Sequence, residues 1–169
     1  NHEKMFEVLV FAENAARQSE DGLELYRIGR FYEEGAKSIR EGRKSNFLSS
    51  PWDEIAFYFS KKDSEIDGFK ILTGYSKDEF YDVIFSGQSY SESRTPQAIF
   101  WLPLAKFGQE FQHWFPPKDQ LDLASIANLK ALQLFRESAL LGEPLAKFHN
   151  AIFLYKKLVK DQTSSLNSE

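Results

Sequence analysis

The sequence LYRIGRFYEEG at residues 25–35 decides the expected fold, and KALQLFRESALLGEPLA at residues 130–146 is its counterpart near the other end. Both segments combine small residues with aromatic residues one helical turn apart, as paired helices that cross closely require. Gly29 is expected at such a crossing, because a glycine inside a helix costs about 1 kcal/mol relative to alanine. Stacked helical pairs build binding surfaces, so these segments favour a protein that binds another protein.

Helix signals recur along the rest of the chain. Residues 76–79 form a capping box before an apolar run, and Gly142 and Pro144 are placed to end one helix and begin the next. No stretch alternates apolar and polar residues over more than a few positions. We therefore predict an all-α fold with helical hairpins at both ends around a central group of shorter helices. The expected helices cover residues 3–18, 23–41, 51–60, 65–72, 77–86, 96–115, 122–140 and 144–160.

The chain has the length of one domain, with 169 residues. Residues 1–160 are expected to form a single helical domain, and the polar segment 161–169 a disordered tail. Residues 87–95 are the best candidate loop. Pro103 is expected to kink or break the helix at 96–115, because proline lacks a backbone donor and crowds the preceding turn.

The amino-acid composition excludes several classes of partner and of chemistry. The net charge of -4, from 21 basic and 25 acidic residues, provides no basic field for a phosphate backbone, so no nucleic acid is expected. No run of 18 apolar residues occurs, so no membrane span is expected. The absence of cysteine excludes disulfides and thiolate chemistry and leaves the compartment open. The cytoplasm is slightly favoured, and a signal peptide removed before Asn1 stays open as an alternative.

The two ends resemble Sel1-type repeats, relatives of the tetratricopeptide repeat. The first part of the repeat pattern is matched by Tyr26, Ile28, Gly29, Tyr32 and Gly35. The second part is matched by Lys130, Ala131, Phe135, Ser138, Ala139, Gly142 and Ala146, and the start of a following repeat by Phe148 and Leu154, with Ala151 in place of its glycine. The middle of the chain does not fit the pattern. The resemblance implies an all-helical adaptor that binds proteins or peptides in a concave groove.

Motifs for catalysis are weak. His2, His113 and His149 are far apart in the sequence and none has a metal ligand at i+4, so no metal site is expected. Acidic pairs such as Asp78-Glu79 lie in the first turn of an expected helix, where they complement the helix dipole. The serines lack a nucleophile elbow and the glycines form no phosphate-binding loop, so neither an enzyme nor a cofactor is favoured.

Aromatic residues are in excess over what one core face needs, with 16 Phe, 7 Tyr and 3 Trp. In the helix expected at 96–115, Phe100, Phe107, Phe111 and Trp114 share one stripe and are assigned to the core, while Trp101 lies off it. Surplus exposed aromatics are typical of interface hot spots. The predicted partner-binding residues are Trp52, Tyr58, Tyr90, Trp101, His113 and Trp114.

The favoured function is therefore that of an adaptor or neutralising partner that binds another protein or a peptide through an aromatic-lined groove. Two alternatives stay open. One is a small helical enzyme whose site combines distant residues such as Glu54, Arg94 and His113. The other is a helical homo-oligomer in which the surplus aromatics form the subunit interface.

Overall fold

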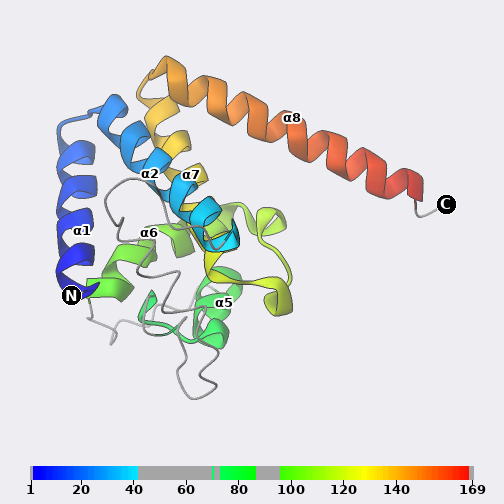
Figure 1. The fold of residues 1–169 in the computed structure, drawn as a ribbon, viewed down its shortest axis with the longest axis horizontal. Helices are drawn as coiled ribbons and strands as arrows, with labels where there is room; N and C mark the ends of the chain where they lie inside the picture. The colour runs from blue at the N-terminus through cyan, green and yellow to red at the C-terminus, as the bar shows by residue number, and fades with distance from the viewer. Residues whose placement is uncertain (1, 42–69, 71–72, 87–95, 168–169) are drawn as a thin grey trace.

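The computed structural model describes residues 2–41, 70, 73–86 and 96–167, and every regular element in this part of the chain is a helix (Figure 1). The all-α prediction is confirmed. The α-helices are α1 (His2–Gln18), α2 (Gly22–Glu41), α5 (Lys77–Ser86), α6 (Pro96–Glu110), α7 (Leu123–Leu140) and α8 (Pro144–Asn167), and two short 3₁₀ helices are η1 (Gln112–Trp114) and η2 (Lys118–Gln120).

The core is organised around α7, which packs most extensively against α2 and also contacts α6 and α8. Leu25, Ile28 and Tyr32 of α2 meet Ile126, Leu134 and other buried residues of α7. A Cβ atom on Gly29 would lie 2.7 Å from Cε1 of Phe135. Gly29 therefore lies at a close crossing of α2 and α7, as the sequence predicts.

Capping interactions account for several helix ends. The backbone N–H of Glu79 donates to Oγ of Ser76 at 3.1 Å, as in the predicted capping box, and Ser125 N–H donates to Oδ1 of Asp122 at 2.7 Å. At the end of α7, Gly142 adopts a positive φ of 93° and its N–H donates to Ala139 O. The N–H of Glu143 donates to Ser138 O, which completes a Schellman motif and reverses the chain into α8.

Helix α6 differs from its predicted form. It runs without interruption through Pro103 and ends at Glu110 rather than near residue 115. Its buried face carries Trp101 and Leu104, both with 0% exposure, whereas Phe107 is only partly buried. The ring of Trp101 contacts that of Tyr32 edge to face, with centroids 6.1 Å apart. The buried face of α6 is therefore the one that carries Trp101. The prediction that Trp101 is exposed is wrong.

Helix α8 is longer than expected. It continues to Asn167, so residues 161–167 are helical and the expected tail there is wrong. No glycine or proline interrupts this segment, and Oγ1 of Thr163 donates to Val159 O at 2.9 Å. Figure 1 shows α8 leaving the end of α7 and extending away from the other helices.

Some predictions fall outside the described residues. They are the helix at 51–60, nearly all of that at 65–72, the loop at 87–95 and the last two residues of the tail. Of the helices that the structure describes, none is both long enough and apolar enough to cross a membrane.

Candidate functional site

A groove of about 220 Å³ lies where α6, α7 and α8 meet. Its aromatic wall is formed by Phe107 and Phe111, whose rings stack with centroids 4.6 Å apart. Leu132 of α7 and Leu154 of α8 add aliphatic surface. The groove is smaller than the roughly 300–1,000 Å³ of typical small-molecule sites. Its size and lining suit an inserted apolar side chain.

Polar groups at the edge of this groove come from α7 and α8. The guanidinium of Arg136 lies 4.1 Å from the ring centroid of Phe111 and 3.5 Å from a carboxylate oxygen of Glu110. Asn150 donates through Nδ2 to Phe135 O at 3.4 Å. Among the described residues, none donates a hydrogen bond to the buried Oδ1 of Asn150. Since an unsatisfied buried acceptor is costly, this oxygen favours a ligand that brings a donor.

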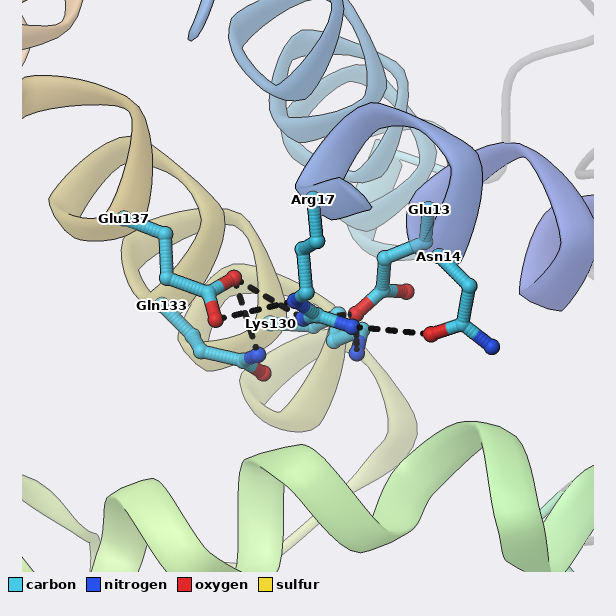
Figure 2. Close-up of polar contacts among 6 residues, drawn as sticks. All are labelled: Glu13, Asn14, Arg17, Lys130, Gln133 and Glu137. Atoms are coloured by element: carbon cyan, nitrogen blue, oxygen red, sulfur yellow. Dashed lines mark hydrogen bonds and ion pairs between the residues drawn. The ribbon is translucent and has the colours of Figure 1, made fainter. Parts of the chain in front are cut away.

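A second polar site joins α1 to α7 (Figure 2). The fully buried Lys130 donates from Nζ to Oε1 of Glu13 at 2.8 Å. Arg17 forms a two-pronged contact with Glu137, from Nε to Oε1 at 3.0 Å and from Nη2 to Oε2 at 2.8 Å, and also pairs with Glu13. The ionic cluster of Glu13, Arg17, Lys130 and Glu137 contains equal numbers of acids and bases, so its formal charges balance.

Burial dominates the electrostatics of this ionic cluster. It lowers the pKa of Lys130, against the opposing attraction of Glu13. For Arg17 burial acts in the same direction, but its bonds to Glu137 and the charge of Glu13 outweigh it and raise the pKa. Burial, assisted by the charge of Glu13, raises the pKa of Tyr32 well above its usual value. Removal of a single charge from this cluster would therefore leave unequal numbers of acids and bases in a largely buried site.

A cavity of about 360 Å³ lies beside the ionic cluster, between α1, α6 and α7. Glu13, Arg17 and Glu137 line it together with Lys106 and apolar side chains. The three cluster members bond to one another, which directs their charges into the α1–α7 contact. Within the described part of the chain, no group of three or more His, Cys, Asp or Glu side chains could hold a metal ion.

The structure describes only some of the predicted partner-binding residues, and their exposure differs. Trp52, Tyr58 and Tyr90 lie outside the described residues, as do Glu54 and Arg94 of the alternative enzyme site. Trp101 is a core residue and is unavailable to a partner. Trp114 ends η1, and its side chain is not among those described. His113 is exposed, does not line the groove, and accepts at its carbonyl from Nζ of Lys157 in α8 at 3.2 Å.

The groove residues were not predicted as a site. Phe107 and Phe111 were assigned to the core from their spacing, but α6 ends before Phe111, which has a non-helical φ of -117°. Arg136, Asn150 and Leu154 carry no local motif. The exposed apolar surface of α8 was detectable, because the helix shows apolar residues on more than one face.

Comparison with protein-family models, curated proteins and solved structures finds no significant match to this chain. The resemblance to Sel1-type repeats therefore stays a prediction. The candidate site rests on its own geometry.

Proposed function

We propose that this chain is a protein-interaction module that binds a peptide segment of another protein in the groove between α6, α7 and α8. The observation that carries the proposal is the coincidence of stacked Phe107 and Phe111 with the buried, unsatisfied acceptor of Asn150 at the wall of one groove. Aromatic anchors supply most of the energy of such contacts, and a buried acceptor supplies direction.

The residues that line the groove indicate which chemical groups a partner should carry. A large apolar side chain of the partner enters between Phe111 and Leu154, and a donor of the partner reaches Oδ1 of Asn150. Arg136 lines the groove and is paired with Glu110, and Lys157 lies one turn of α8 after the lining residue Leu154. Lys157 leaves this edge with a net positive charge, so an acidic residue that flanks the apolar anchor is favoured. An amphipathic helix with one apolar anchor and a neighbouring acid meets these requirements.

The test is selection of binders from a displayed library of helical peptides, followed by affinity measurement on two matched variants. Phe111→Ala removes a groove ring, and Phe11→Ala makes the same change on the exposed face of α1. We expect F111A to weaken binding of the selected peptides at least tenfold and F11A to leave it unchanged, with equal helix content by circular dichroism. Equal binding to both variants would show that the peptides bind elsewhere and would overturn the proposal.

A further inference from the structure

The exposed side of α8 carries a regular apolar pattern that the groove does not use. We call it the outer stripe, and its members follow one another in alternating steps of three and four residues: Leu145, Phe148, Ile152, Tyr155, Val159, Gln162 and Leu166. All seven are exposed, with Phe148 at 63%, Tyr155 at 68% and Leu166 at 74%, and all except Gln162 are apolar or aromatic. This is the heptad repeat of a coiled-coil helix.

The outer stripe lies opposite the face that α8 turns to its own domain. That inner face includes buried Ala146, Asn150 bonded to α7, and Lys157 bonded to the carbonyl of His113. At 100° per residue, these positions lie about half a turn from Phe148 and Val159. The domain therefore leaves the outer stripe open, and the extension of α8 in Figure 1 keeps it clear of the other helices.

We propose that two copies of this chain associate through their α8 helices, packed in parallel along the outer stripe. The spacing of the outer stripe indicates that its partner is a helix. An average spacing of 3.5 residues keeps the stripe facing a second helix along its whole length. Binding to a lipid surface does not require this spacing. Ile152 and Val159 occupy the positions where β-branched residues favour two parallel strands.

Between two copies of α8, charge favours the parallel orientation. The positions that flank the stripe carry His149, Lys156 and Thr163 on one edge and Ala151 and Leu158 on the other. A parallel pair places Lys156 of one copy against Ala151 of its partner, with no like charges in contact. An antiparallel pair would place the Lys156 edge of one copy against the same edge of the other.

The available area suits a specific pair. The seam from Leu145 to Leu166 is about 30 Å long at 1.5 Å per residue. Covering a fully exposed aromatic ring buries roughly 150–250 Å². Phe148 and Tyr155 are each about two-thirds exposed before pairing, so the four rings of two copies together contribute about 500 Å². The aliphatic members bring the total to the order of 1,000 Å², which is the lower bound of specific interfaces.

Sedimentation velocity of the full chain and two variants tests the proposal. The unaltered chain, with a monomer mass of 19.6 kDa, should sediment as a dimer. Tyr155→Glu should weaken association at least thirtyfold, while Ser164→Glu on the exposed opposite side of α8 should leave the dimer intact. A monomeric parent chain, or a dimer that persists in Y155E, would overturn the proposal. Equal circular dichroism spectra exclude unfolding as the cause.

Cross-linking tests the parallel arrangement, because the chain contains no cysteine and a single introduced one can only bond to another copy. Val159→Cys should form a covalent dimer on oxidation, since the two Val159 positions face each other in a parallel pair. Ser164→Cys should remain largely uncross-linked. Absence of cross-linking in V159C would contradict parallel pairing. None of these variants alters the peptide groove, so the outcome is independent of the proposed function.

Discussion

Helices α7 and α8 are adjacent in sequence and each carries 11 apolar or aromatic residues, in 18 and 24 positions respectively, yet their surroundings differ. Nearly every side chain of α7 from Leu123 to Phe135 is buried, including the charged Lys130. Most of α8 from Ala151 onward is exposed, including Phe153, Tyr155 and Leu158. Apolar content therefore does not decide burial in this protein; what decides it is whether other helices surround the element.

The same comparison explains where stability and binding are located. Helix α7 is enclosed by α2, α6 and α8, and the ionic cluster joins it to α1, so changes there should act on folding. Helix α8 offers an inner face to the groove and an outer face to solvent, so changes there should act on association. Matched substitutions in the two helices should therefore differ in their effects on folding and on association.

Among changes to charged side chains, the largest effect is expected for Lys130→Met. This change leaves Glu13 buried with only Arg17 as a counter-ion and should lower the free energy of unfolding by about 3 kcal/mol. The same substitution at exposed Lys147 of α8 should change it by less than about 0.5 kcal/mol. Urea unfolding of both variants measures the difference. Similar losses would mean that α7 and α8 are equally coupled to the core.

Gly29→Leu should lower the free energy of unfolding by about 2 kcal/mol or more, because its side chain would collide with the ring of Phe135. Gly29→Ala should give a smaller loss in the same direction, since even its Cβ would lie 2.7 Å from Cε1 of that ring. Thermal unfolding of the two variants checks the order. An unchanged midpoint in G29L would show that α2 and α7 do not cross closely here.

Tyr32 should make the protein less stable in alkali. Its raised pKa means that the folded state keeps a proton that the unfolded state releases above about pH 10, so stability falls as pH rises through that window, by up to about 1.4 kcal/mol per pH unit. The lowered pKa of Lys130 acts in the opposite sense below its ordinary value of 10.5, so the fall is steepest above that pH. Unfolding measured against pH should show this fall in Tyr155→Phe and a weaker one in Tyr32→Phe. Equal slopes would contradict the assignment.

The smallest effect is expected for Leu158→Ala, with less than about 0.5 kcal/mol lost from the free energy of unfolding, because the side chain is already exposed. Leu134→Ala in α7 removes a fully buried side chain and should cost about 2–5 kcal/mol. Chemical unfolding of L158A and L134A compares the loss of stability for the same substitution in α8 and in α7. A large loss in L158A would show that α8 is packed against the domain along its whole length.

Local signals in the sequence predict much of this fold. The Ser76 cap, the Gly142–Pro144 junction and the crossing at Gly29 each follow from the backbone chemistry of a few neighbouring residues. Which face of α6 is buried could not be predicted from such local signals. Trp101 and Phe107 are both large aromatic residues, and only the packing of Trp101 against Tyr32 in the folded chain decides which of them is buried.

The candidate site was less predictable because its members are distant in sequence. Phe107, Leu132 and Leu154 come from three helices and meet only in the folded chain. The pair of Glu13 and Lys130 likewise joins residues far apart in sequence. No periodicity within one segment reports such a contact. The outer stripe of α8 is the exception, because its heptad spacing is present in the sequence alone.

The division of α8 into two binding faces is tested most directly by sedimentation of two neighbouring variants with a labelled peptide selected for the groove. Leu154→Lys should lose the peptide and remain a dimer, because Leu154 lines the groove. Tyr155→Lys should retain the peptide and become a monomer, because Tyr155 lies on the outer stripe. Loss of both properties in both variants, or the reverse assignment, would contradict the account.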